Sequence, residues 1–231
     1  MSYSVRPLLQ FACLAALTVA PFAGAADVPV GDPFYLGNCP VSGAAIDSKG
    51  EPVVKVYEGR EIKFCCGGCP AGFEKDLAAS LAKVDAQLIA DQTPVYPLDV
   101  CVNSGAKIEE GKGVEFVAAN RMFRTCCENC KAKVLADPAS FISKLDAAVI
   151  EKQSADYKAE TCPVSGEKLG SMGEPVNVVI GNHLVKLCCD GCKKPLAKDP
   201  AKHMAKLGGA PAAEAAATEA PAANKAKKAD R

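Results

Sequence analysis

The sequence predicts an α+β protein built from three tandem units, each with a cysteine turn, a β-hairpin, a cysteine knuckle and a helix. A stretch with cysteines at its first, second and fifth positions occurs at residues 65–69, 126–130 and 188–192. A further cysteine stands in a short turn upstream of each knuckle, at positions 39, 101 and 162. Alternating apolar residues precede each knuckle and a helical apolar period follows it, which predicts the hairpin and the helix.

The repeat divides most of the chain into units that we expect at residues 33–92, 93–154 and 155–207. Units of about 60 residues bury little apolar surface and commonly need metal ions or disulfides to fold. From residue 208 to 231 the chain is rich in Ala, Pro, Glu and Lys without an apolar period, which predicts a disordered tail.

The first 25 residues are predicted to be a signal peptide. Arg6 precedes an apolar run, and Ala23, Gly24 and Ala25 supply the small residues that a signal peptidase prefers. A membrane anchor is the weaker interpretation, because the run is shorter than the about 20 residues that span a bilayer. We therefore expect a periplasmic or secreted protein with no membrane contact after cleavage. Of the 13 cysteines, only Cys13 lies in the removed segment, which leaves four per unit.

The composition argues against several classes of function. The chain carries 27 basic and 27 acidic residues without a block of like charge, so we expect no nucleic-acid partner. It has no Trp and only two His, which leaves little material for acid–base chemistry. We therefore expect that the protein is not an enzyme.

In the first unit, residues 53–57 and 61–66 are predicted to pair as a hairpin around a turn at Glu58 and Gly59. Apolar residues from Phe73 to Leu88, at spacings of three and four, predict a helix after Cys69. The second and third units repeat this plan, with turns expected at Ala119 and Asn120 and at Gly181 and Asn182. Their helices are expected to start at residues 137–138 and 199–200, where an aspartate at the N-cap precedes a proline.

The cysteines suit soft or borderline metal ions, which thiolates bind from short, stiff turns. Four sulfurs per unit are enough for a closed tetrahedral site. Adjacent cysteines on a strand point to opposite faces, so which of each adjacent pair binds stays open unless the strand ends before them. The candidate metal ligands are Cys39, Cys65, Cys66, Cys69, Cys101, Cys126, Cys127, Cys130, Cys162, Cys188, Cys189 and Cys192.

Neighbouring residues give further expectations for these thiols. The residue before the last cysteine is expected in the left-handed conformation, and the last cysteine at a helix N-terminus that favours its thiolate. A cation two positions before each adjacent pair is expected to lower the pKa of the pair's first cysteine. The residues expected to be left-handed are Gly68, Asn129 and Gly191. The cations expected to lower the pKa are Lys63, Arg124 and Lys186.

Other conspicuous side chains have plainer interpretations. His183 and His203 do not recur in the other units, so we expect neither to be a ligand. Tyr35, Tyr96 and Tyr157 recur a few residues before the upstream cysteine and are expected to pack over its turn.

The stretch Phe64-Cys65-Cys66-Gly67-Gly68-Cys69, together with Cys39, resembles the TRASH and YHS families of small metal-binding domains. The resemblance implies a treble-clef-like fold, three in tandem, and a role in heavy-metal sensing, trafficking or resistance. Thr125 and Leu187 depart from the pattern, where the family has phenylalanine. The ligands that the resemblance implies are Cys39, Cys65 and Cys69, then Cys101, Cys126 and Cys130, then Cys162, Cys188 and Cys192.

The leading hypothesis from the sequence is an exported protein that sequesters or traffics Cu(I) or Zn(II) through three cysteine sites, with a delivery or receptor protein as a possible partner. One alternative is a scaffold for protein contacts in which each ion is structural zinc. Another is a disulfide framework or a thiol-redox module, which an oxidising compartment favours.

Overall fold

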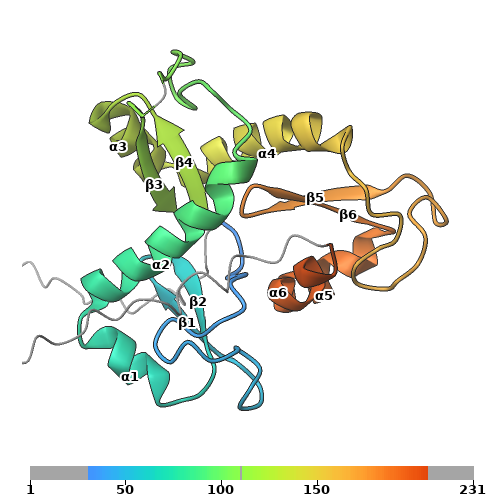
Figure 1. Ribbon diagram of the computed structural model, residues 1–231, viewed down its shortest axis with the longest axis horizontal. Coiled ribbons are helices and arrows are strands. Elements are labelled where there is room, and N and C mark those ends of the chain that lie inside the picture. The colour runs from blue at the N-terminus through green and yellow to red at the C-terminus, as the bar shows by residue number, and fades with distance from the viewer. Residues whose placement is uncertain (1–30, 110, 208–231) are drawn as a thin grey trace, which may run out of the picture.

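The structure is a computed structural model that describes residues 31–109 and 111–207, so the predicted signal peptide and tail lie outside the described residues. Within these ranges the chain forms three two-stranded antiparallel sheets and a set of short and medium helices (Figure 1). The predicted α+β class is therefore confirmed. The sheets pair β1 (Val53–Tyr57) with β2 (Arg60–Phe64), β3 (Val114–Ala118) with β4 (Arg121–Thr125), and β5 (Val176–Ile180) with β6 (His183–Leu187).

The three hairpins close through the same kind of two-residue turn. Both turn residues have positive φ, which matches the right-handed twist of the paired strands. The predicted turn positions are confirmed, and the φ angles are 52° and 73° at Glu58 and Gly59, 53° and 60° at Ala119 and Asn120, and 55° and 61° at Gly181 and Asn182.

Each hairpin is followed by two helices rather than one. Asp76, Asp137 and Asp199 separate the two members, and each aspartate side chain accepts a backbone N–H three residues ahead. The predicted caps at Asp137 and Asp199 are thus confirmed. The short helices between the knuckle and the cap were not predicted in the second and third units. The α-helices are α1 (Cys69–Glu74), α2 (Leu77–Gln92), α3 (Glu128–Ala136), α4 (Pro138–Ser154), α5 (Lys193–Lys198) and α6 (Pro200–Met204), and the 3₁₀ turns are η1 (Thr93–Val95), η2 (Asp190–Cys192) and η3 (Ala205–Leu207).

The long helix of each of the first two units packs on the hairpin of the next unit. Helix α2 lies against β3 and β4, and α4 lies against β5 and β6 (Figure 1). Gln92 is the last residue of α2. Its side chain donates to the carbonyl of Asn120 (3.2 Å) and accepts the N–H of Met122 (2.7 Å). Gln153 makes the same pair of bonds around Asn182 at 2.8 Å each. A glutamine near each helix end therefore holds the next hairpin turn.

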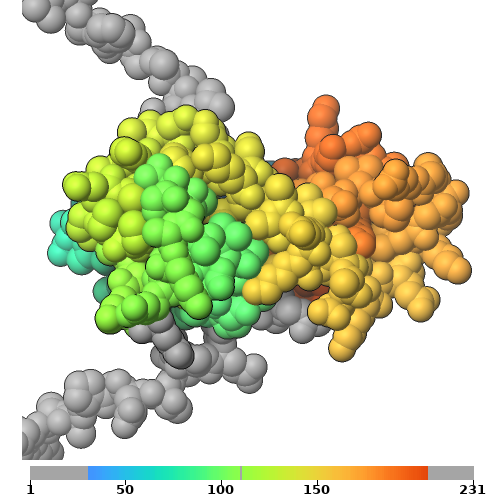
Figure 2. Space-filling model, turned by 90° about the horizontal axis from the view of Figure 1, so that it is seen from above, coloured from blue at the N-terminus to red at the C-terminus, as the bar shows by residue number. Residues whose placement is uncertain are grey.

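The first and third units share one core instead of folding around separate ones. One apolar cluster joins Phe34 and Phe64 of the first unit to Leu187 and Leu196 of the third. The second unit has its own cluster. Across the shared boundary, the ammonium of Lys63 donates to the carbonyl that ends α5 (2.7 Å). On the face seen in the space-filling view, the third unit, in orange, lies next to the yellow α4 region (Figure 2).

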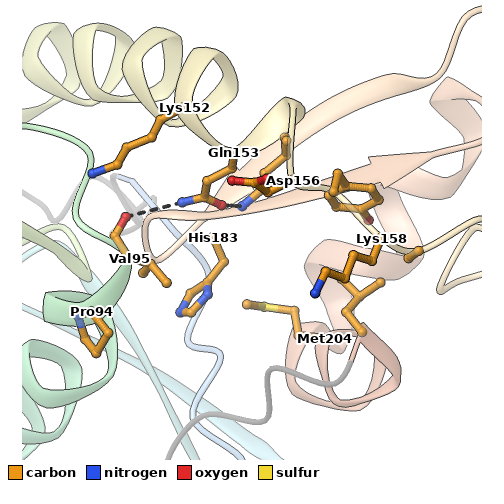
Figure 3. A pocket seen from close by; sticks show the side chains of 12 residues that line it. Pro94, Val95, Lys152, Gln153, Asp156, Lys158, His183 and Met204 are labelled. Carbon is orange, nitrogen blue, oxygen red and sulfur yellow. Dashed lines mark hydrogen bonds between the residues drawn. The ribbon is translucent and has the colours of Figure 1, made fainter.

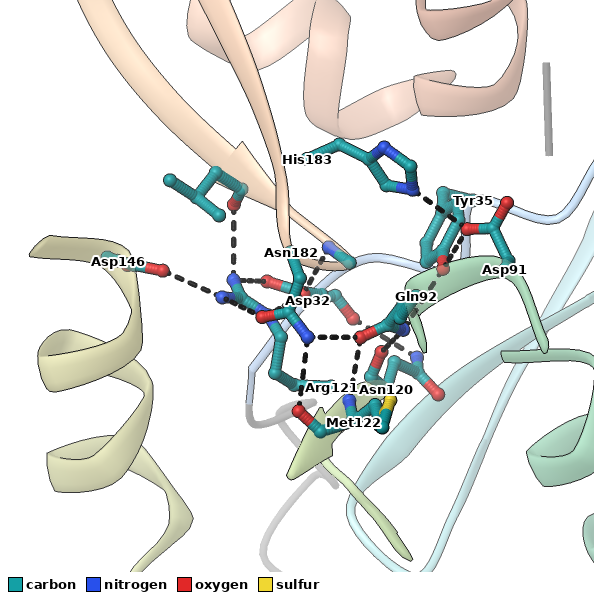
Figure 4. Close-up of polar contacts among 12 residues, drawn as sticks. Asp32, Tyr35, Asp91, Gln92, Asn120, Arg121, Met122, Asp146, Asn182 and His183 are labelled. Atoms are coloured by element: carbon teal, nitrogen blue, oxygen red, sulfur yellow. Dashed lines mark hydrogen bonds and ion pairs between the residues drawn. The ribbon is translucent and has the colours of Figure 1, made fainter. Parts of the chain in front are cut away.

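A buried polar network lies where the second and third hairpin turns meet the start of the described chain (Figure 4). The fully buried guanidinium of Arg121 binds both carboxylate oxygens of Asp32, at 2.6 and 2.8 Å, and Asp146 at 2.8 Å. Asp32 also accepts the N–H of Gly181 at 2.7 Å. Burial disfavours the charge of Arg121, but the two carboxylates outweigh it and raise the pKa of Arg121 above its ordinary value.

Among the described helices, no segment combines the length and apolar character that crossing a bilayer requires.

Candidate metal centres

The structure brings three cysteines of each unit into a compact cluster. Within each cluster all three Sγ atoms lie within 4.8 Å of one another. These are the nine residues that the family resemblance implies as ligands. The clusters are Cys39, Cys65 and Cys69 in the first unit, Cys101, Cys126 and Cys130 in the second, and Cys162, Cys188 and Cys192 in the third.

The upstream cysteine is held by a tight turn that is the same in all three units. In the first, the N–H of Cys39 donates to the carbonyl of Ala44, and the N–H of Gly43 donates back to the carbonyl of Cys39, both at 2.8 Å. Gly43 has φ 70°, and Gly105 and Gly166 repeat this left-handed position at 70° and 79°. Only glycine adopts such a conformation without strain, so the motif Ser-Gly fixes where the upstream sulfur lies.

The adjacent cysteine pair stands just beyond the end of the strand. β2 ends at Phe64, so strict alternation no longer applies to Cys65 and Cys66. The Sγ atom of Cys69 lies 3.8 Å from that of Cys65 and 3.5 Å from that of Cys66. Both members of the pair therefore face the last cysteine. The first member completes the cluster and the second lies at its edge.

The prediction that the residue before the last cysteine is left-handed is wrong. Gly68 has φ −81°, in the right-handed helical region, and Asn129 and Gly191 lie inside α3 and η2. The chain passes from the knuckle directly into helical turns, because the N–H of the last cysteine bonds to the carbonyl three residues earlier, at 3.1 to 3.2 Å. Left-handed residues occur in the upstream turn instead.

A fourth sulfur borders each cluster on its more exposed side. Cys66 and Cys189 are half-buried and Cys127 is exposed. The Sγ atom of Cys189 lies 3.9 Å from those of both Cys188 and Cys192, while that of Cys127 lies 3.8 Å from Cys126. Each outer sulfur is therefore near enough to join the cluster and also faces solvent.

The upstream thiols are acidic. Burial of Cys39 opposes ionisation, but the hydroxyl of Ser42 and several backbone N–H groups favour the thiolate and lower the pKa of Cys39 to about 6. The same balance lowers the pKa values of Cys101 and Cys162 to about 6. At neutral pH these three turns therefore present an anionic sulfur ready for a cation.

The prediction that helix N-termini favour the last thiolate is wrong for the first and third units. Burial, followed by the neighbouring sulfurs of the cluster, raises the pKa values of Cys69 and Cys192 to about 12. For Cys126, the hydroxyl of Ser104 favours the thiolate, but the sulfurs of Cys130 and Cys101 outweigh it and raise the pKa to about 11. In the first and third units, burial and the neighbouring sulfurs thus raise the pKa of the last thiol although it lies at the start of a helical turn.

The basic residues before the adjacent pairs were predicted to lower the pKa of the first cysteine, but their charged groups bind elsewhere. Lys63 donates to the Lys198 carbonyl (2.7 Å). Arg124 binds Glu115 (2.9 Å) and lies over the ring of Tyr96. Lys186 lies over the ring of Tyr157, 5.1 Å from its centre. Their charges are engaged by other partners.

A serine hydroxyl supports the first cysteine of each adjacent pair. Ser42 Oγ lies 3.2 Å from Cys65 Sγ, Ser104 Oγ 3.5 Å from Cys126 Sγ, and Ser165 Oγ 3.3 Å from Cys188 Sγ. Hydrogen bonds to ligand sulfurs orient them and adjust their electron density.

Both histidines have other partners. His183 Nε2 lies 3.0 Å from Asp91 Oδ2, and His203 Nδ1 lies 3.1 Å from a backbone carbonyl. His183 also lines a pocket of about 430 Å³ together with Lys152 and Met204, and no cysteine lines that pocket (Figure 3). The hydroxyl groups of Tyr96 and Tyr157 accept backbone N–H groups of the second strand, at 2.9 and 3.0 Å.

The sulfur geometry fits a metal ion. An ion with metal–sulfur bonds of about 2.3 Å in a tetrahedral site separates its sulfurs by about 3.8 Å. The observed separations between the first and last knuckle sulfurs are 3.8, 3.7 and 3.7 Å. All twelve cysteines of the described chain are free thiols.

No protein-family model, characterised protein or solved structure matches the chain. The fold and the clusters therefore define the class of protein only broadly, as an α+β protein with three cysteine clusters able to bind metal.

Proposed function

We propose that the protein is exported and sequesters or carries soft or borderline metal ions, Cu(I) or Zn(II), through its three cysteine sites. The observation that carries this proposal is the recurrence of the cluster: three sulfurs within 4.8 Å of one another occur in each of three units. In each unit a fourth thiol lies at the edge of the cluster, half-buried at Cys66 and Cys189 and exposed at Cys127. An outer thiol of this kind gives an incoming or departing ion a ligand to exchange.

Further support comes from the ligand positions. The nine clustered cysteines are those that the TRASH and YHS pattern assigns, so the proposal includes three tandem treble-clef-like domains of this type. The sulfur-only set favours soft cations and does not choose between Cu(I) and Zn(II). A delivery or receptor protein that exchanges the ion with the outer thiols completes the proposal.

A structural role for the ions is the second candidate. The clustered cysteines of the first and third units belong to the shared apolar core, which suits ions that hold small units together. The protein is then a scaffold, and its ions leave only when it unfolds.

Elemental analysis of protein purified under reducing, chelator-free conditions, with a thiol count on the same sample, tests the proposal. We expect about three equivalents of metal, as one ion per four-cysteine site requires. Absence of bound metal together with few free thiols and an intact fold would overturn it in favour of a disulfide framework.

A further inference from the structure

The three clusters share one backbone plan but differ in what surrounds them. The six clustered cysteines of the first and third units all belong to one apolar core, together with Phe64 and Leu187, the residues just before each adjacent pair. Their first knuckle cysteines, Cys65 and Cys188, are 0% and 2% exposed. An ion in either site is thus enclosed by side chains that pack only when the two units are docked.

The cysteines of the middle cluster belong to none of the three apolar clusters of the described chain, although Cys101 and Cys130 are themselves 1% and 7% exposed. Cys126 is half-buried and Cys127 is exposed. The residue before them is Thr125, whose hydroxyl bonds to the carbonyl of Cys127 at 3.4 Å. Solvent, and therefore another ligand, reaches the middle cluster more readily than the other two.

The middle cluster also has a hydrogen bond that the others lack the side chain to make. The amide of Asn103 donates to Cys130 Sγ at 3.2 Å. Val41 and Val164 take this position in the first and third units. An N–H donor draws electron density from a thiolate, so the sulfur donates less to a bound ion and the bond to that ion weakens.

We propose that the middle site is the exchange site of the protein, whereas the first and third sites keep their ions as part of the fold. This inference rests on the proposed function. It assigns the cargo ion to the middle site and structural ions to the first and third sites. The occupant of the middle site is a soft or borderline cation that is passed by thiolate exchange, entering and leaving through Cys127. Each metal–sulfur bond that breaks is replaced by one to the incoming thiolate, so no oxidant or reductant is needed.

The test uses the full chain loaded with Zn(II) under reducing conditions and challenged with a chromogenic zinc chelator. We expect one equivalent to leave in a fast phase while far-ultraviolet circular dichroism stays unchanged. The other two leave at least about tenfold more slowly and together with loss of the fold, since their release needs the shared core to open.

Variants assign the phases to sites. The double variant C101S/C130S should lose the fast equivalent and keep two ions with the folded spectrum, whereas C39S/C69S should lose a slow one. The variant N103V should slow the fast phase by about tenfold, because removing the donor strengthens the Cys130 bond. The reciprocal V41N, at a side chain that is 45% exposed, is the matched control for a polar residue in this turn.

The result separates the two proposals. Three ions released in one phase, or a fast phase that survives in C101S/C130S, overturn the exchange site while metal binding stands. A chain that takes up no zinc overturns metal binding itself and the exchange site with it.

Discussion

Arg60 and Arg121 hold the same position in successive units, at the start of β2 and β4, but only Arg121 has a partner for each side-chain nitrogen. Arg121 binds Asp32 through two nitrogens and Asp146 through the third. Arg60 Nη1 lies 2.6 Å from Asp85 Oδ1, outside hydrogen-bond geometry, and no described residue accepts from its Nε or Nη2. Two buried side-chain nitrogens of Arg60 without an acceptor therefore lower stability in the first unit.

The two arginines should respond differently to the same substitution. Arg121→Met leaves the carboxylate of Asp32 buried without its cation, and we expect a loss of about 3 to 5 kcal/mol. Arg60→Met removes two unsatisfied donors and leaves Asp85 partly solvated, so we expect a change of less than about 1 kcal/mol. Urea unfolding of both metal-loaded variants measures this, and equal losses would contradict the assignment.

The hairpin turns offer a second matched pair. Ala119 and Gly181 occupy the same turn position, at φ 53° and 55°. Ala119→Gly relieves the left-handed strain of alanine, and we expect a gain of about 0.5 to 1 kcal/mol. Gly181→Ala should destabilise by more than about 1 kcal/mol, because its Cβ would overlap the ring of Tyr35. Thermal unfolding of both variants decides, and a loss in A119G would count against the turn geometry.

Substitutions within one cluster should separate the core ligands from the outer thiol. Cys69→Ser removes a clustered sulfur, and we expect the metal content to fall by about one equivalent. Cys66→Ser removes only the outer sulfur, so the ion should stay bound but exchange with a competing thiol at a different rate. Metal content after gel filtration gives the first comparison. Loss of a full equivalent in C66S would make Cys66 an obligatory ligand.

The acidic upstream thiols predict an unusual pH dependence of the metal-free, reduced protein. Thiolate absorbance near 240 nm should show a step near pH 6 from Cys39, Cys101 and Cys162, well below the ordinary range of about 8.5. Because the folded pKa is lowered, the stabilising contribution is present above about pH 8.5 and is lost as the pH falls through 6. Ser42→Ala removes the strongest favourable contact of Cys39 and should raise its pKa. A first step near pH 8.5 in the parent protein would refute this account.

Features set by neighbouring residues could be predicted from the sequence. The turns at residues 119–120 and 181–182 and the caps at Asp137 and Asp199 depend on local conformational preferences, and they are found as expected. Helices α3 and α5 were missed because they are short and bury few side chains, among them Val134 and Leu196.

The remaining features depend on contacts between distant parts of the chain. Which cysteine of each pair joins the cluster follows from where the strand ends, and that is set by packing. The Arg121–Asp32 pair joins residues 89 positions apart, and no local sequence pattern predicts it. Likewise, the sequence shows Asn103 only as a turn residue, and its hydrogen bond to Cys130 follows from the fold.

The docking of the third unit on the first fixes an order of events during synthesis. Lys63 meets its partner carbonyl only after a further 135 residues have been made. The middle cluster, by contrast, spans residues 101–130, so all its ligands emerge well before the last unit does. All ligands of the middle cluster are thus present in a nascent chain while the apolar face around Phe64 is still uncovered, because Leu187 and Leu196 have not yet been made. During that interval the apolar face of the first unit is open to chaperones and to aggregation.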